Sequence, residues 1–242
     1  MLIMNQVDSG RPPVMLVTGS RKGIGDFLAR HYVEKGWQVI GCSREVASWS
    51  HPRYEHHLVD ITDEKAVIAL FTMIRKIHGR LDAALNNAGI ASMNHFTLTP
   101  AETVSRIFST NVTGTFIIAR EAAKLMISQK SGRIVNFSSI ASPLSLEGES
   151  VYAASKAAVE SFTKIMAREL SAWNITVNAV GPTPIDTDLI RGVPSEKMTK
   201  LLERLPTRKA GNFEQVTHIV DFFLAPLSDC ITGQILYLGG VG

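Results

Sequence analysis

Short apolar runs alternate with amphipathic helical patterns along almost the whole chain, and this alternation restricts the possible folds more than any other feature of the sequence. The first apolar run, 14–17, leads into a glycine-rich stretch and then into a helical pattern over 25–35. Strands that are separated by helices pair in parallel, because each helix returns the chain to the same end of the sheet. The alternation therefore predicts an α/β fold: one domain with a doubly wound parallel sheet and helices on both faces.

The periodicity of the apolar residues places the individual elements. Strands are predicted at 14–17, 37–42, 55–59, 82–86, 133–137, 175–180 and 233–238. Helices are predicted at 25–35, 63–78, 100–129, 151–172 and 213–224. Thr62 suits the N-cap of the second helix, and Pro100 suits the first turn of the third. The stretch between the second and third strands is too short for a crossover helix with its loops.

Two segments depart from the regular alternation. Residues 1–13 mix polar residues with short apolar runs, so we expect a flexible N-terminal tail that is neither a signal peptide nor a membrane anchor. Residues 183–208 carry several prolines and a short helical pattern after the sixth strand. Connections at that end of a parallel sheet carry ligand-binding residues, so this segment is expected to be a substrate lid on the single domain formed by 14–242.

Composition argues against several classes of function. Hydrophobic residues make up 45% of the chain and charged residues 19%, as is typical of a globular domain. The net charge of +3 is small and forms no basic stripe, so no nucleic-acid partner is expected. No apolar run is long enough to cross a bilayer, so we expect no membrane association and a cytoplasmic location. Cys42 and Cys230 show no metal-ligand spacing, so no metal is expected, and both are interpreted as buried fillers.

A glycine-rich turn follows the first strand, with the spacing Gly-x-x-x-Gly-x-Gly. Glycines in such a turn let backbone N–H groups and the N-terminus of the next helix approach a pyrophosphate. The alternative is a plain strand-to-helix connection, but the position after the first strand favours a dinucleotide site. A nucleotide triphosphatase is disfavoured because no Gly-Lys-Ser/Thr ending is present. The cofactor-binding candidates in this turn are Gly19, Ser20, Arg21, Lys22, Gly23, Ile24 and Gly25.

The charges beside this turn indicate which dinucleotide binds. An acidic residue at the end of the second strand would bind a ribose 2′-hydroxyl, whereas an arginine accommodates a 2′-phosphate. That strand ends in Ser43-Arg44, and Arg21 and Lys22 add positive charge nearby. One charge-assisted hydrogen bond contributes about 1.5–3 kcal/mol, so these residues predict NADP(H) rather than NAD(H). The alternative is that the three basic side chains are solvated surface charges.

Tyr152 and Lys156 lie four residues apart in a predicted helix, so their side chains can face the same ligand. A phenol with a pKa of about 10 is a poor acid–base catalyst near pH 7, and a nearby ammonium lowers that pKa. The same spacing also occurs often on solvated helices. Two further features favour a catalytic site: the hydroxyls of Ser138 and Ser139 after the fifth strand, and Asn111 within a helical pattern that disfavours asparagine.

Each of these polar residues also has a purely structural interpretation. The two serines could cap or turn the chain rather than bind a substrate oxygen. Asn111 could face water, or it could hold a water molecule or a backbone group inside a site.

Taken together, these features resemble the short-chain dehydrogenase/reductase family in its compact form. The resemblance runs over 14–240, nearly the whole chain. The glycine turn matches the family's cofactor turn, and Asn-Asn-Ala-Gly at 86–89 matches the signature that closes the fourth strand. The resemblance implies a Rossmann-like fold and the catalytic tetrad Asn111, Ser139, Tyr152 and Lys156.

The resemblance also implies a role for each member of the tetrad. Tyr152 would protonate a carbonyl oxygen, or deprotonate an alcohol, as a hydride moves from or to the nicotinamide. Ser139 would hold the same oxygen, and it is preferred to Ser138 because it lies thirteen residues before Tyr152, as in close relatives. Lys156 would lower the pKa of Tyr152 and bind the nicotinamide ribose. Asn111 would keep a water molecule that relays protons to Lys156.

Further cofactor contacts follow from the same resemblance. Asp60 matches the aspartate that contacts the adenine, and Thr187 matches the threonine that holds the carboxamide. The expected contacts outside the glycine turn are Ser43, Arg44, Asp60, Ile61, Asn87, Ala88, Gly89, Tyr152, Lys156, Pro182 and Thr187.

Three positions depart from the family pattern. Gly-Pro-Thr-Pro stands at 181–184 where the family usually has Pro-Gly, which predicts a different backbone beside the nicotinamide. The connection after Arg44 is short, which puts the wall on the adenine side in doubt. Leu238 stands where a polar residue commonly precedes the final Gly-Gly.

The expected substrate is a small carbonyl compound or alcohol. Resemblance at 231–234 and around Tyr152 favours a 3-oxoacyl thioester. Its walls are expected at 90–94, 141–147 and 187–208, with apolar side chains from Leu144, Leu146, Leu189, Ile190 and Met198. Lys130 and Arg133 could meet an acidic carrier protein, although solvated surface charge is the favoured interpretation.

Other functions are compatible with parts of this pattern. The protein could be an NAD(P)-dependent dehydrogenase of another small alcohol. Nucleotide-sugar epimerases and dehydratases share the Tyr-x-x-x-Lys pair, but those chains are usually longer and differ in glycine spacing. A non-catalytic NADP(H)-binding regulatory protein would be expected to have an eroded tetrad, and here the tetrad is intact. The family usually forms homotetramers or homodimers through the helices predicted at 100–129 and 151–172, so such an assembly is expected.

Overall fold

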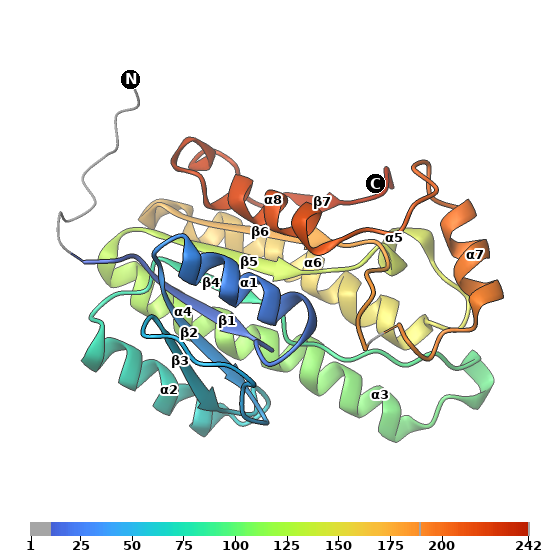
Figure 1. Ribbon diagram of the computed structural model, residues 1–242, viewed down its shortest axis with the longest axis horizontal. Helices are drawn as coiled ribbons and strands as arrows, with labels where there is room; N and C mark the ends of the chain where they lie inside the picture. Colours follow the sequence, from blue (N-terminus) through green and yellow to red (C-terminus); the bar gives the residue numbers. More distant parts are fainter. Residues whose placement is uncertain (1–10, 189, 242) are drawn as a thin grey trace.

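The computed structural model describes residues 11–188 and 190–241, in which a parallel sheet is covered by helices on both faces (Figure 1). Within these residues the sheet has seven strands in the order β3-β2-β1-β4-β5-β6-β7, and all neighbours pair in parallel. The strands are β1 (Val14–Thr18), β2 (Gln38–Ser43), β3 (Tyr54–Leu58), β4 (Ala83–Asn86), β5 (Gly132–Phe137), β6 (Ile175–Gly181) and β7 (Ile235–Tyr237). The predicted doubly wound α/β fold is confirmed.

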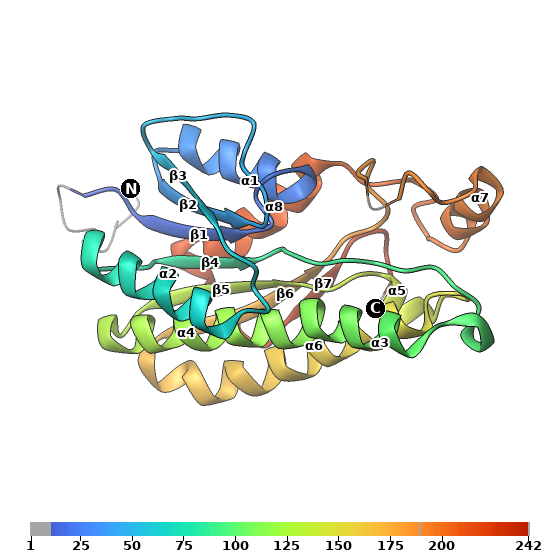
Figure 2. The ribbon, with the colours of Figure 1, turned by 90° about the horizontal axis from the view of Figure 1, so that it is seen from below.

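Two layers of helices enclose the sheet (Figure 2). One layer is α2 (Glu64–Ile77), α4 (Thr115–Gln129) and α6 (Ser150–Leu170), and the other is α1 (Gly23–Glu34) and α8 (Phe213–Leu224). The shorter elements are η1 (Phe96–Leu98), α3 (Ala101–Phe108), η2 (Ser109–Gly114), α5 (Ala141–Leu144), η3 (Ser171–Trp173), α7 (Ser195–Glu203) and η4 (Pro226–Ser228).

The interior strand β1 shows why an apolar run in this sheet can be continuous. Val14 and Leu16 belong to the core beneath α2, α4 and α6, whereas Met15 and Val17 belong to the core beneath α1 and α8. Successive strand side chains point to opposite faces, and here both faces are covered. Every position of β1 is therefore buried, and no polar face remains to produce an alternating pattern.

Two local predictions need correction. Asp63, not Thr62, caps α2, and its carboxylate accepts hydrogen bonds from the backbone N–H groups of Lys65 (2.9 Å) and Ala66 (3.1 Å). Thr62 instead donates its hydroxyl to Asp60. Cys42 is buried as expected, but Cys230 is exposed, so the buried-filler interpretation is wrong for that residue.

The helix predicted over 100–129 is interrupted by a π-helical turn, η2, which joins α3 to α4. Asn111 lies in this turn, and π-bulges in helices often occur at functional sites. The connection between β2 and β3 contains no helix, as its length predicted.

The order of the strands fixes where a ligand can bind. From β1 the sheet grows outward to β2 on one side and, through β4, to β5 on the other, so the connections at its carboxyl end diverge between β1 and β4. Open α/β sheets bind ligands in the crevice at such a switch point. No helix of the described residues is long and apolar enough to cross a membrane. Residues 1–10 of the predicted tail, Leu189 of the predicted lid and Gly242 lie outside the described residues.

Candidate active site

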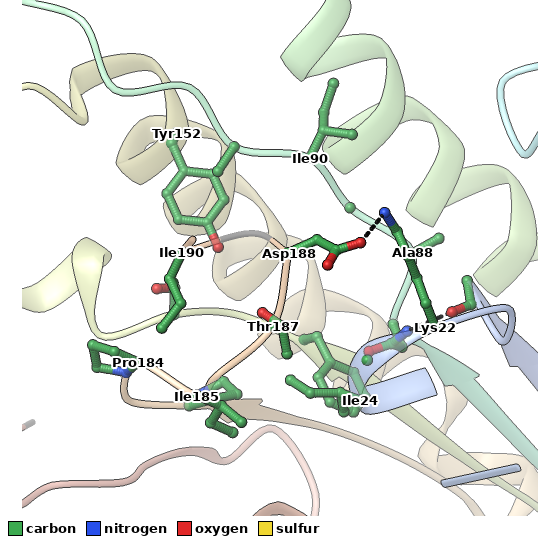
Figure 3. A pocket seen from close by; sticks show the side chains of 18 of the residues that line it. Lys22, Ile24, Ala88, Ile90, Tyr152, Pro184, Ile185, Thr187, Asp188 and Ile190 are labelled. Carbon is green, nitrogen blue, oxygen red and sulfur yellow. Dashed lines mark hydrogen bonds and ion pairs between the residues drawn. The ribbon is translucent and has the colours of Figure 1, made fainter. Parts of the chain in front are cut away.

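A cavity of about 880 Å³ opens at this switch point. It extends from the glycine turn to Tyr152, and the segment after β6 forms its outer wall (Figure 3). A volume of this size is typical of sites for cofactors and small ligands. The carboxyl end of the sheet is therefore where both cofactor and substrate are expected.

The glycine turn has the geometry of a dinucleotide cradle. Gly19 and Gly23 have φ values of +68° and +61°, in the left-handed region that favours glycine. A Cβ atom on Gly25 would lie 2.3 Å from the carbonyl oxygen of Gly19 and 2.5 Å from Nδ2 of Asn87. A side chain at this position would force the turn and the start of α1 apart. The turn thus keeps the start of α1 free to face an anion, which is the environment that a pyrophosphate needs.

The end of β4 locks this turn in place. Asn87 donates its side-chain amide to the carbonyl oxygen of Thr18 at 2.9 Å, and the N–H of Ala88 donates to the Thr18 hydroxyl at 3.0 Å. These bonds join two segments that are about 70 residues apart in the sequence. Asn87 and Ala88 therefore hold the glycine turn in place and also line the cavity.

Nearly all of the predicted site residues line the cavity. The exceptions are Ser20, Gly25 and Asn111. Ser20 is fully buried behind the turn, where its hydroxyl accepts a hydrogen bond from the Tyr54 hydroxyl at 3.0 Å. Of the apolar residues expected in the substrate walls, Leu146, Ile190 and Met198 line the cavity and Leu144 does not.

The basic residues beside the glycine turn have partners that the sequence did not reveal. Arg21 pairs with Glu45 at 3.1 Å, and Lys22 reaches Asp188 at 2.6 Å, as Figure 3 shows for the second pair. Both carboxylates line the cavity. Arg44 is exposed and forms no ion pair within the described part of the chain. Glu45 follows Arg44 directly, but nothing in the sequence indicated that it would face Arg21.

Tyr152 and Lys156 lie buried at the opposite end of the cavity, as their spacing predicted. The Lys156 ammonium donates to the carbonyl oxygen of Phe137 at 2.8 Å and lies 5.6 Å from the centre of the Tyr152 ring. Burial lowers the pKa of Lys156 to about 8, against an opposing effect of the Glu160 carboxylate. Burial raises the pKa of Tyr152 to about 12, while a hydrogen bond with Ser139 lowers it and the Glu149 charge raises it.

The two neighbouring serines point to different partners. Ser138 is buried and donates its hydroxyl to the Glu160 carboxylate, although it also lines the cavity. Ser139 lines the cavity and hydrogen-bonds Tyr152, and its hydroxyl oxygen also accepts from the N–H of Ala141 at 3.2 Å. Of the two, Ser139 is thus the serine beside the tyrosine.

Asn111 does not face water. Its Oδ1 accepts from the N–H of Ile90 and its Nδ2 donates to the Ile90 carbonyl oxygen, both at 2.9 Å. Nδ2 also donates to the Ser155 hydroxyl at 3.0 Å. The side chain therefore holds a backbone group, which is one of the interpretations that the sequence left open, and fixes the loop after β4 against α6.

A further carboxylate, Glu149, faces this end of the cavity and was not singled out from the sequence. It lies three residues before Tyr152 and is half-buried, and burial raises its pKa. Within the described residues no side chain or backbone group donates a hydrogen bond to its carboxylate, whereas its main-chain carbonyl oxygen accepts from the N–H of Ala153. The signal in the sequence is its position three residues before Tyr152.

A family model described as short chain dehydrogenase matches residues 13–197. The chain belongs to the short-chain dehydrogenase family. It is an NAD(P)-dependent oxidoreductase, and the resemblance inferred from its motifs is confirmed. The assignment agrees with the structure, in which the glycine turn, Tyr152 and Lys156 all line one cavity.

Known proteins are similar to this chain along nearly its whole length. The 3-oxoacyl-(acyl-carrier-protein) reductase FabG of Vibrio cholerae is 32% identical over 233 residues, which cover 94% of this chain and 96% of that protein. The structure of ElxO with NADP bound has a TM-score of 0.87 at 29% identity and covers 94% of this chain and 97% of that one. The aldohexose dehydrogenase of Thermoplasma acidophilum has a TM-score of 0.86 at 30% identity, with coverage of 95% and 94%.

Proposed function

We propose that the protein is an NADP(H)-dependent reductase that transfers a hydride between the nicotinamide and a carbonyl or secondary alcohol, with a 3-oxoacyl thioester as its substrate. The observation that carries this proposal is the cluster of Ser139, Tyr152 and Lys156 at one end of the cavity, opposite the glycine turn. The similarity to the Vibrio cholerae reductase supports the choice of substrate.

Each residue of the cluster has a distinct chemical task. NADPH supplies the hydride when it is bound. Tyr152 donates a proton to the substrate oxygen, and Ser139 holds that oxygen through its hydroxyl. The Lys156 ammonium favours the phenolate that Tyr152 becomes, and it also binds the nicotinamide ribose. Asn111 holds the loop at Ile90 beside the site and keeps a water molecule for proton relay to Lys156.

NADP(H) is the cofactor because the end of the cavity beside the glycine turn offers guanidinium groups. We call it the adenosine end, since the adenosine of the cofactor would bind there. Arg21 and Arg44 both line this end, and Arg44 has no competing carboxylate within the described residues. An arginine binds phosphate through two parallel hydrogen bonds, which a ribose hydroxyl cannot match. The bound NADP of ElxO supports the same choice. Asp60 and Ile61 contact the adenine, and Thr187 holds the carboxamide.

The segment 183–208 acts as a lid over the substrate, as part of a single domain. Ile190 and Met198 from this segment line the cavity together with Leu146 from the loop after α5. These side chains supply an apolar wall that suits an acyl chain.

A second candidate function follows from Glu149. Glu149 lines the cavity, and its half-buried carboxylate has no donor among the described residues, so it can accept a hydrogen bond from a ligand. A hydroxyl on the substrate would donate that bond, which favours a hydroxylated alcohol such as a sugar or polyol. The similarity to an aldohexose dehydrogenase supports this alternative.

A cofactor-oxidation screen tests both candidates. NADPH consumption is measured with 3-oxoacyl thioesters, simple ketones, quinones and sugars, and NADP⁺ reduction is measured with the corresponding alcohols. The proposal expects the highest kcat/KM with a 3-oxoacyl thioester, whereas the alternative expects it with a sugar or polyol. Tight NADPH binding without turnover on any compound would contradict both and favour a regulatory binding protein.

The protein acts in the cytoplasm as a homotetramer or homodimer. Phe116 of α4 and Ile165 of α6 are 45% and 53% exposed, and apolar side chains at such positions suit a helix-to-helix interface. Light scattering tests the assembly, and a monomer at micromolar concentration would contradict it.

A further inference from the structure

Glu160 lies one helical turn beyond Lys156 on α6, outside the tetrad. Its carboxylate accepts hydrogen bonds from Ser138 and, at 3.2 Å, from Ser142. The hydroxyl of Tyr237 on β7 also hydrogen-bonds this carboxylate. Three hydroxyl groups from separate segments therefore converge on one half-buried charge.

Two of these contacts clamp the segment that carries Ser139. Ser138 precedes Ser139 directly, and Ser142 lies three residues after Ser139. Within the segment, the Ser139 hydroxyl oxygen accepts from the N–H of Ala141. Because Glu160 holds the chain on both sides of Ser139, it fixes the direction in which the Ser139 hydroxyl points.

The same carboxylate balances the charge of Lys156. The groups around the Lys156 ammonium are the Tyr152 ring and Glu160 from α6, the Phe137 carbonyl from β5, and the backbone near Gly89. Among them, Glu160 carries the negative charge that favours the protonated form of Lys156 and so opposes the effect of its burial.

Tyr237 connects this arrangement with two departures from the family pattern. A Cβ atom on Gly181 would lie 2.3 Å from Cδ1 of Tyr237, so the tyrosine ring packs where only glycine leaves room. Burial raises the pKa of Tyr237, and the Glu160 carboxylate raises it further, so the phenol stays protonated and donates. The glycine at the start of 181–184 and the sequence before the final glycines are therefore coupled through this contact.

We propose that Glu160 is a positioning residue for the reaction, which clamps the Ser139 segment and maintains the charge of Lys156, with Tyr237 as its third hydrogen-bond donor. The proposal rests on the proposed function, in which Ser139 and Lys156 act on the substrate and cofactor.

The test is the pH profile of kcat/KM for NADPH-dependent reduction, measured on the full chain with the best substrate from the screen. The alkaline limb of the wild-type profile is expected near pH 8, where Lys156 loses its proton. Glu160→Gln removes the charge, so this limb moves by about one unit to lower pH, and the loss of Lys156 protonation alone lowers kcat/KM at pH 7 about twofold. Tyr237→Phe keeps the carboxylate, so the limb stays in place and kcat/KM falls about two- to fivefold.

Glu169→Gln is the matched control. It removes the same charge from an exposed position nine residues further along α6, roughly 13 Å from Glu160 and beyond the screening length at physiological salt. Its profile is expected to equal that of the wild type.

Glu160→Asp decides the matter if the glutamine variant folds poorly, because aspartate retains the charge and should retain the position of the alkaline limb. A folded Glu160→Gln variant with a wild-type limb would overturn the proposal. The proposal would also be overturned if the alkaline limb moved as far in Glu160→Asp as in Glu160→Gln. The same holds if it moved as far in the control Glu169→Gln as in Glu160→Gln. Failure of the proposed function is seen separately, as turnover that survives Tyr152→Phe.

Discussion

The two ends of the cavity are built in different ways. At the proposed catalytic end, Asn111, Tyr152 and Lys156 are buried, and Asn111 and Lys156 bond to backbone groups of neighbouring segments. At the proposed adenosine end, beside the glycine turn, Arg21 and Lys22 are partly exposed and pair with carboxylates on exposed side chains. One end is fixed before any ligand arrives, whereas the other can exchange its partners.

This difference suits the two tasks of a hydride-transfer enzyme. Proton and hydride transfer require reacting atoms at fixed separations, and buried side chains with backbone partners provide this. Exposed ion pairs contribute only about 0–1 kcal/mol, so Arg21 and Lys22 can leave Glu45 and Asp188 for cofactor phosphates at little cost. The adenosine end should therefore control affinity and cofactor preference, and the catalytic end should control rate and stability.

The largest effect on stability is expected for Asn111→Ala. This change leaves the N–H and carbonyl groups of Ile90 without their partner, at a cost of about 3 kcal/mol. For a chain of this size the melting temperature should fall by about 6–12 °C, as measured by calorimetry. A melting temperature within about 2 °C of wild type would show that the catalytic end is not fixed by this side chain.

Arg44→Ala is expected to change cofactor preference without a comparable loss of stability. The loss of one charge-assisted contact with the 2′-phosphate should reduce the ratio of kcat/KM for NADPH to that for NADH about tenfold. Glu45→Gln is the matched variant, because it frees Arg21 and should move the same ratio in the opposite direction. An unchanged ratio in both variants would remove the adenosine end from the account of cofactor choice.

The smallest effect is expected for Lys22→Met. The Lys22–Asp188 pair is exposed, so its loss should leave the melting temperature within about 1 °C of wild type. The KM for NADPH should rise about two- to fivefold because one phosphate contact is lost. A large drop in melting temperature would show that this pair holds the segment after β6 in place, contrary to the contrast drawn above.

The sequence predicted the catalytic end better than the adenosine end, for a physical reason. Tyr152 and Lys156 share one helix, so their spacing alone places both side chains on one face. Asn111 was conspicuous because asparagine is unfavourable within a helix, and the π-turn there explains its presence.

The partners of the basic residues could not be predicted in the same way. Asp188 meets Lys22 across 166 positions of the chain, and no local pattern indicates such a contact. Glu45 likewise meets Arg21 from a different segment, and no local pattern indicates that contact. Glu160 did carry a signal, since it lies four residues after Lys156 on the same helix face. Its partner Tyr237 becomes visible only when β7 is placed beside β6.

The proton-transfer role of Tyr152 is the central claim, and Tyr152→Phe tests it most directly. The variant keeps the ring and its packing but removes the hydroxyl that hydrogen-bonds Ser139. The NADPH dissociation constant, measured by fluorescence titration, should stay within about threefold of wild type, while kcat should fall by about 10²–10⁴. Wild-type turnover by this variant would contradict the role assigned to Tyr152 and with it the proposed mechanism.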